Sequence, residues 1–198
     1  MEPIKTIYGY LHPCSGSSDY RKKNRCAVDR FKSGNVRSVY LEEPAVLTLP
    51  SGDFQVELIT FFEDGNVKRI FPLYGQISAY WSIEEEKELA PYYDFEIEGE
   101  IFHIRPQCIY FYPSGSIRSI TLWPGDTIEV RTSYGVIKTG LGVELYESGK
   151  LRSIEPSFGT VLNTPEGEIR PFRYRMSMFH AENALLRFTE DGKLGLSG

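Results

Sequence analysis

Four segments of this chain repeat one detailed pattern, and the pattern restricts the fold more than any other feature of the sequence. Each segment runs from an aromatic residue through two polar residues to a glycine, followed by a polar, an aliphatic, a basic, a polar and a second aliphatic residue. The four segments are residues 31–39, 62–70, 112–120 and 146–154. A fifth, degenerate copy begins at Phe188. We call this pattern the template and name its five turns by their glycines, Gly34, Gly65, Gly115, Gly149 and Gly192.

The template has the chemistry of a tight β-hairpin. Ser-Gly and Asp-Gly pairs supply the positive φ that short β-turns require. The aromatic residue ends the incoming strand and the first aliphatic residue begins the outgoing one, so the two can pair across the turn. A second glycine turn, which we call the companion turn, lies upstream of several template turns, at residues 50–52, 98–99, 133–135 and 165–167. Each repeat is therefore expected to contain two strands and two turns.

The spacing of the template turns is irregular. Successive template glycines are 31, 50, 34 and 43 residues apart, so the shorter spacings approximate the repeat and the longer ones contain insertions. The largest insertion is assigned to residues 76–98, where Ser82 and Glu85 have the spacing of a capping box and Pro91 would end a helix. This insertion is predicted to form a short helix or an acidic loop. Residues 176–185 fit either a strand or a helical turn.

Composition agrees with a sheet protein. Aromatic residues make up 14% of the 198 residues, and flat rings pack well on a pleated, half-buried surface. The 18 glycines and 12 prolines agree with many turns. We therefore predict one all-β domain over residues 1–198, built from consecutive antiparallel β-hairpin repeats. The hairpins would form an elongated twisted sheet or an open barrel-like meander, with at most one or two short helices.

The aromatic-x-x-Gly-x-aliphatic-basic-Ser unit resembles the MORN-type repeats, particularly the bacterial variant often labelled antitoxin-like. The resemblance covers roughly residues 28–196. It implies consecutive hairpins in an elongated twisted sheet that serves as a scaffold or an interaction surface.

Charge and hydropathy exclude several classes of partner. A net charge of −5 would repel nucleic acid and anionic membranes, so we expect no nucleic-acid partner. No apolar run is long enough to span a membrane. The N-terminus shows no apolar segment of a signal peptide, which favours a cytoplasmic location. The three cysteines, Cys14, Cys26 and Cys108, are then expected to be reduced.

A basic residue follows each of the first four template glycines at the third position. These residues are Arg37, Lys68, Arg118 and Arg152. In stacked hairpins equivalent positions recur about 10 Å apart, so the four cations could form a row that binds phosphate or carboxylate groups. The alternative is a solvated face on which each cation pairs with a carboxylate beside the turns, such as Glu63 or Glu147. An unpaired, exposed row would indicate a polyanion or lipid-headgroup binder.

Exposed aromatic residues are the other candidate binding surface. Tyr80, Trp81, Tyr92 and Tyr93 flank the insertion rather than the template, which favours their exposure. Exposed tyrosine and tryptophan side chains are efficient anchors for protein partners. They can equally form the core of a thin sheet.

Catalytic and metal-binding motifs are weak. The sequence lacks a nucleophile elbow and a phosphate-binding glycine loop, and Gly140 and Gly142 are interpreted as a bulge or a site of close packing. The spacing of His12, Cys14 and Cys26, with His103 and Cys108 elsewhere, is wrong for a structural zinc site. We therefore assign no catalytic residue, no metal and no cofactor.

Two functional hypotheses follow. The first is a cytoplasmic β-repeat scaffold that binds a protein through one sheet face and the 76–98 insertion, and that can self-associate through edge strands. The second is a small hydrolase or carbohydrate-active enzyme, which would need two carboxylates beside a Tyr or Trp platform in a groove.

Overall fold

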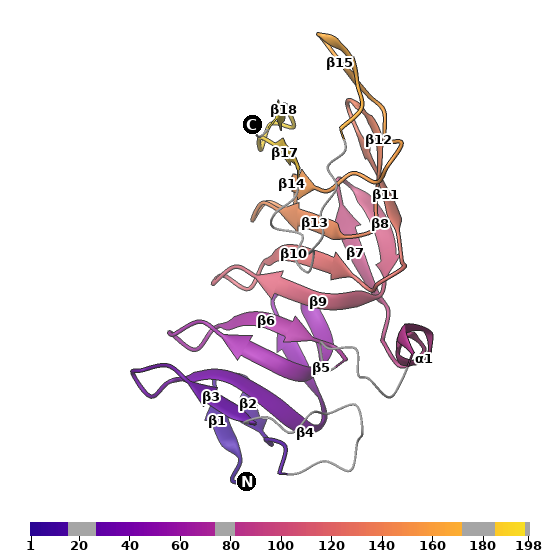
Figure 1. Cartoon of the computed structure of the whole chain (residues 1–198). Helices are drawn as coiled ribbons and strands as arrows, with labels where there is room; N and C mark the ends of the chain where they lie inside the picture. The colour runs from indigo at the N-terminus through magenta and orange to yellow at the C-terminus, as the bar shows by residue number, and fades with distance from the viewer. Residues whose placement is uncertain (16–26, 74–81, 172–184, 197–198) are drawn as a thin grey trace. The chain divides into compact units, whose positions relative to one another are not determined.

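The computed structural model describes residues 1–15, 27–73, 82–171 and 185–196. Among these residues the secondary structure is antiparallel β-strand with one short helix, which confirms the predicted all-β, hairpin-based fold (Figure 1). The chain divides into two compact units. Unit 1 contains Met1–Pro91 and Pro106–Ser116, and unit 2 contains Tyr92–Arg105 and Ile117–Gly198. That the whole chain folds as a single domain stays a prediction.

Unit 1 is built on five antiparallel strands whose order in the sheet is their order in the chain. They are β3 (Val28–Arg30), β4 (Val36–Leu49), β5 (Gly52–Phe61), β6 (Val67–Phe71) and β9 (Pro106–Phe111). A separate two-stranded hairpin, β1 (Ile4–Thr6) and β2 (Gly9–Leu11), lies against β4. Unit 1 also holds the helix α1 (Ile83–Lys87).

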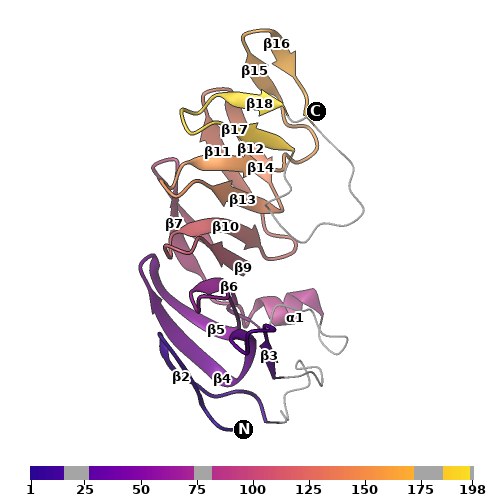
Figure 2. The ribbon, with the colours of Figure 1, turned by 90° about the vertical axis from the view of Figure 1, so that its left-hand side faces the viewer.

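Unit 2 repeats this plan. Its main strands also follow the chain order: β10 (Ile117–Leu122), β13 (Gly142–Leu145), β14 (Leu151–Ile154), β17 (Leu186–Phe188) and β18 (Leu194–Leu196). Three separate hairpins accompany them, namely β7 (Tyr93–Ile97) with β8 (Glu100–Ile104), β11 (Ile128–Thr132) with β12 (Gly135–Thr139), and β15 (Leu162–Thr164) with β16 (Gly167–Ile169). The tip of β11–β12 is joined to β15 by a hydrogen bond from the N–H of Asn163 to the carbonyl of Tyr134 at 2.8 Å (Figure 2).

The last aliphatic residue of the template forms the centre of the core. Val39, Ile70, Ile120 and Ile154 are all fully buried. In unit 1, Val39 and Ile70 both pair with Ile59. In unit 2, Val143 takes the corresponding place between Ile120 and Ile154. The template therefore places one β-branched side chain of each hairpin in a continuous row within each unit, and burial of such side chains is the main stabilising term.

All five template turns have the same hydrogen bonds. In the first, the N–H of Gly34 donates to the carbonyl of Phe31 at 3.0 Å and the N–H of Phe31 donates to the carbonyl of Asn35 at 2.8 Å. Gly34 has φ 90°, and the other template glycines have φ between 80° and 92°. This is the three-residue hairpin loop that ends on a glycine in the left-handed region. In the fifth copy the same two bonds start at Thr189, so Thr189, and not Phe188, takes the place of the aromatic residue.

Of the two alternatives predicted for the insertion, a short helix or an acidic loop, the structure contains the short helix. Ser82 is the N-cap of α1: its hydroxyl accepts the N–H of Glu85 at 3.1 Å, and the Glu85 carboxylate accepts the N–H of Ser82 at 2.8 Å. Residues 76–81 lie outside the described part of the chain. The remainder of the assigned insertion, up to residue 98, includes β7, which belongs to a regular hairpin. The irregular part of the insertion therefore ends before β7.

The turn of the β1–β2 hairpin is a further companion turn, and it shares its tip sequence with the companion turns at residues 133–135 and 165–167. In the hairpins β1–β2, β11–β12 and β15–β16 a Thr-x-x-Gly segment forms the tip. In each tip the threonine hydroxyl donates to the glycine carbonyl at 2.8–2.9 Å. The three segments are residues 6–9, 132–135 and 164–167. Residues 139–142 have the same spacing, with a longer contact of 3.5 Å. There a Cβ on Gly142 would lie 2.0 Å from the carbonyl oxygen of Ile120, so close packing explains this glycine.

Candidate binding pocket

In each template turn, one backbone N–H forms no hydrogen bond within the turn. It belongs to the residue two positions after the glycine, and in three turns a side chain from a companion hairpin accepts it. The N–H of Val67 donates to the Tyr8 hydroxyl at 3.1 Å. The N–H of Leu151 donates to the Glu98 carboxylate at 2.6 Å, and that of Leu194 to the Tyr134 hydroxyl at 3.1 Å. Companion hairpins therefore dock by their tips onto template turns.

The turn at Gly115 receives a companion tip in another way. Pro50, at the tip of the β4–β5 hairpin, lies so close that a Cβ on Gly115 would be 2.8 Å from the proline Cγ and Cδ. Only a residue without a side chain fits beneath this proline. Gly115 also has φ 87°, which favours glycine in its own right.

At the first template turn, a pocket of about 780 Å³ takes the place of a companion tip, and residues of the turn at Gly34 line this pocket. Its walls are the N-terminal segment with β1, the turn at Gly34 and the next turn at Gly65. Val36 is the residue whose N–H corresponds to those of Val67, Leu151 and Leu194. No described side chain accepts the N–H of Val36. The pocket thus lies at the place that a docked companion tip takes at the later turns.

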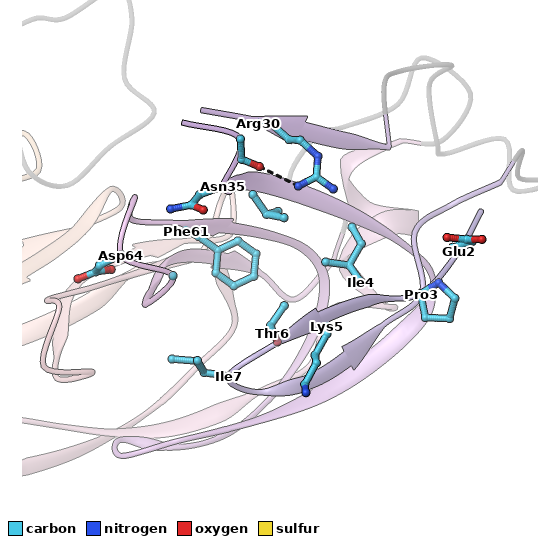
Figure 3. A pocket seen from close by; sticks show the side chains of 13 residues that line it. Glu2, Pro3, Ile4, Lys5, Thr6, Ile7, Arg30, Asn35, Phe61 and Asp64 are labelled. Atoms are coloured by element: carbon cyan, nitrogen blue, oxygen red, sulfur yellow. Dashed lines mark hydrogen bonds between the residues drawn. The ribbon is translucent and has the colours of Figure 1, made fainter. Parts of the chain in front are cut away.

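The pocket has mixed chemistry. Ile4 and Phe61 supply apolar surface on its two sides (Figure 3). Lys5 and Arg30 are its cations, and the Arg30 guanidinium donates to the carbonyl of Gly34 at 2.9 Å. The carboxylates Glu2 and Asp64 also lie on its walls. Such a site can hold a side chain that has an apolar stem and a hydrogen-bond acceptor at its end.

Three of the four predicted basic residues are paired with carboxylates. Arg37 pairs with Asp29 on the neighbouring strand β3. In unit 2 Glu144 is buried, and its carboxylate lies 3.3 Å from Nε of Arg118 and 3.8 Å from Nη1 of Arg152. The Ser153 hydroxyl donates to the same carboxylate at 3.0 Å.

The fourth basic residue contacts aromatic rings. The Lys68 ammonium lies 5.6 Å from the ring centroid of Phe62 and 6.0 Å from that of Tyr110, within the range of a cation–π contact. The unpaired row of cations that a polyanion binder requires is therefore not formed by these four residues.

The predicted aromatic residues do not form one surface. Tyr80 and Trp81 lie outside the described residues. Tyr92 is exposed and stacks on the ring of His103 with centroids 4.5 Å apart, while the Arg105 guanidinium lies 4.5 Å from the same tyrosine ring. Tyr93 is half-buried and packs near Phe95.

A smaller pocket of about 380 Å³ bears on the enzyme hypothesis. It places Glu42 and Glu43 near Tyr10, which is the combination of residue types that a carbohydrate-active groove would need. The Glu42 carboxylate on β4, however, accepts both the N–H and the hydroxyl of Ser15. These hydrogen bonds connect β4 to the segment that comes after β2. A structural contact of this kind occupies the carboxylate that catalysis would require.

Cysteine and histidine residues lie apart from one another in the described part of the chain. Cys14 is half-buried and Cys108 buried, both as free thiols, and Cys26 lies outside that part. Nδ1 of His103 donates a hydrogen bond to the Asp94 carboxylate at 2.7 Å on the exposed face of β7–β8. No group of three or more His, Cys, Asp or Glu side chains suited to a metal ion occurs among the residues described. Within the same residues, no helix has the length and apolar character that crossing a membrane requires.

Reasoning from the sequence missed Tyr8, Glu98 and Tyr134 as docking residues. The sequence contains a pattern that could have indicated a shared role for two of them, because Tyr8 and Tyr134 both occupy the third position of a Thr-x-x-Gly segment. The partner of each residue lies more than fifty positions away along the chain, so the contact itself could not be read from local spacing.

Comparison of the chain with protein-family models, curated proteins and solved structures finds no match.

Proposed function

We propose that this chain is a cytoplasmic β-repeat scaffold of the MORN-like type, and that it holds a protein partner at the pocket beside the first template turn. The observation that carries the proposal is the pocket of about 780 Å³ at a position where the later turns are covered by companion tips. A partner that presents a β-hairpin tip would make the contact that Tyr8, Glu98 and Tyr134 make elsewhere.

The expected mode of recognition follows from the pocket's groups. The N–H of Val36 would donate to a side-chain oxygen of the partner. Ile4 and Phe61 would pack against the stem of that side chain, and Lys5 and Arg30 would favour an acidic end. A protein side chain has these properties together, whereas nucleic acid would be repelled by the net charge of −5.

The test is site-specific photo-crosslinking in the native host. A photoreactive amino acid replaces Asn35, an exposed residue of the pocket wall. In the control it replaces Lys150, which is also exposed and holds the same place in the turn at Gly149. The docking position beside Lys150 is already filled by Glu98. We expect a discrete protein adduct from position 35 and none from position 150. Adducts from neither position, or equally from both, would contradict the proposal.

A further inference from the structure

The hairpin β15–β16 has the same tip as the hairpins that dock. In Thr164-Pro165-Glu166-Gly167 the threonine hydroxyl donates to the glycine carbonyl at 2.8 Å, as Thr132 does to Gly135. Gly167 has φ 124°, close to the 129° of Gly135. Glu166 therefore holds the place that Tyr134 holds in its own hairpin. Glu166 is exposed, however, whereas Tyr134 is half-buried by its contact with the fifth template turn.

The docking contacts follow one rule along the chain. Each companion tip reaches not the template turn that comes next in the sequence but the one after it. Thus Tyr8 precedes the turn at Gly34 and docks at Gly65, while Glu98 precedes the turn at Gly115 and docks at Gly149. Pro50 precedes Gly65 and lies on Gly115, and Tyr134 precedes Gly149 and docks at Gly192. By this rule the tip at Glu166, which precedes Gly192, does not dock at the turn of Gly192, and no described residue forms a hydrogen bond with its side chain.

The first template turn is the one that no described companion tip covers. Among the described residues, the tip at Glu166 has no turn to dock on and the turn at Gly34 has a pocket in place of a tip. We propose that the β15–β16 hairpin of one molecule docks in the pocket of a second copy, with the Glu166 carboxylate accepting the N–H of Val36. This inference rests on the proposed binding role of the pocket and names its partner.

The chemistry of the two surfaces agrees. A glutamate already accepts the equivalent N–H at Leu151, where the carboxylate of Glu98 is 2.6 Å from the nitrogen. The pocket adds two cations, Lys5 and Arg30, that would favour a carboxylate over the phenol found at other turns. Docking would also place β16 of one copy next to β1 of the other, because β1 forms a wall of the pocket.

The contact would extend the series of neighbouring hairpins that each molecule already contains in unit 2. Within unit 2 the hairpin β15–β16 follows β11–β12 and is bonded to it through Asn163 and Tyr134. Docking would add β1–β2 of the second copy as the next member of that series. Since the tip and the pocket are different surfaces, the association is head-to-tail and can continue beyond two copies.

Sedimentation of the purified full-length chain over a range of concentrations tests the inference. We expect self-association whose dissociation constant rises about tenfold or more in Glu166→Ala, because a charge-assisted hydrogen bond is lost. The matched control is Glu168→Ala, which removes an exposed carboxylate from the same hairpin and leaves its tip intact. A wild-type chain that stays monomeric at all concentrations would overturn the inference. Self-association that Glu166→Ala leaves unchanged would overturn it too, because another surface would then be responsible.

Disulfide trapping gives an independent readout that does not depend on affinity. Glu166→Cys is mixed with Asn35→Cys under mild oxidation, and in the control with Lys150→Cys. We expect a crosslinked pair that contains one molecule of each variant in the first mixture and not in the second. Equal yields in the two mixtures would contradict docking at the first turn. If the purified chain is monomeric but position 35 still forms an adduct with a different protein in the host, this inference fails and the proposed function stands.

Discussion

The first and the fourth template turns have the same backbone structure, but a companion tip contacts the fourth turn and a pocket lies beside the first. Both have the same pair of hydrogen bonds, and Gly34 and Gly149 have φ 90° and 82°. At the fourth turn Glu98 accepts the N–H of Leu151, whereas at the first turn the corresponding residue, Val36, lines a pocket of about 780 Å³. The template therefore specifies the turn, while the neighbouring hairpin determines whether the turn is covered by a tip or lies beside a pocket.

The largest effect is expected from a side chain placed between a companion tip and its turn. Gly115→Ala would force a Cβ to within 2.8 Å of Pro50 and strain a residue at φ 87°. Gly149→Ala meets only the backbone strain, because nothing lies within 4 Å of its added Cβ. We expect Gly149→Ala to lower the free energy of unfolding by about 1–2 kcal/mol and Gly115→Ala by roughly 1–3 kcal/mol more. Denaturant unfolding of both variants measures this; equal losses would mean that Pro50 does not restrict the third turn.

Removing the acceptor at the fourth turn should make it resemble the first. Glu98→Ala leaves the part-buried N–H of Leu151 without its partner, which we expect to cost about 1–3 kcal/mol of unfolding free energy. Glu166→Ala is the matched control, because it removes a tip glutamate whose side chain forms no hydrogen bond with any described residue. In dilute protein the control should unfold like the wild type. A comparable loss in both variants would show that docking at Leu151 contributes nothing specific.

A smaller effect is expected where the acceptor is a phenol. Tyr134→Phe keeps the ring beside Phe188 but removes the hydroxyl that accepts the N–H of Leu194. We expect a loss of about 1 kcal/mol. Tyr10→Phe, in an exposed position, should change the unfolding free energy by less than about 0.5 kcal/mol. Amide hydrogen exchange at Leu194 should accelerate in Tyr134→Phe alone; unchanged protection there would contradict the assigned acceptor.

The smallest effect concerns the charges of the fifth turn. The Lys193 ammonium, followed by the Thr189 hydroxyl, lowers the pKa of Asp191 from 3.8 to about 2. Because the folded pKa lies below the unfolded one, the associated stability is present above pH 3.8 and is lost as the pH falls toward 2. The groups are fully exposed, so the change in stability should be small. NMR titration should find the Asp191 pKa near 2 in the wild type and closer to 3.8 in Lys193→Ala. An unchanged pKa in that variant would show that Lys193 is not the cause.

The turns were predictable from sequence because their causes are local. Each template turn depends on a glycine that can take a positive φ and on two hydrogen bonds within five residues. The α1 capping box was predictable for the same reason, since Ser82 and Glu85 are three residues apart. The buried row of Val39, Ile70, Ile120 and Ile154 followed from the constant place of the aliphatic residue after the glycine.

The candidate site was not predictable, because it depends on residues far apart in the chain. Arg37 and Arg118 have the same place in the template, yet one pairs with a half-buried Asp29 and the other with a buried Glu144. The contact between the Tyr8 hydroxyl and the N–H of Val67 joins residues 59 positions apart, so only the fold brings them together. The pocket likewise combines the N-terminal strand with two turns that the sequence separates.

The sequence alone determined that this protein is a series of antiparallel hairpins, because glycine conformation and strand pairing across a tight turn are properties of short segments. Which turns are covered, and which one lies beside a pocket, follows from the tertiary structure and not from the local sequence. That choice depends on the tip of one hairpin meeting a turn two template positions further along. The physical cause is the need of one backbone N–H for an acceptor, which a side chain supplies at Val67, Leu151 and Leu194, whereas no side chain in the described part of the chain supplies it at Val36.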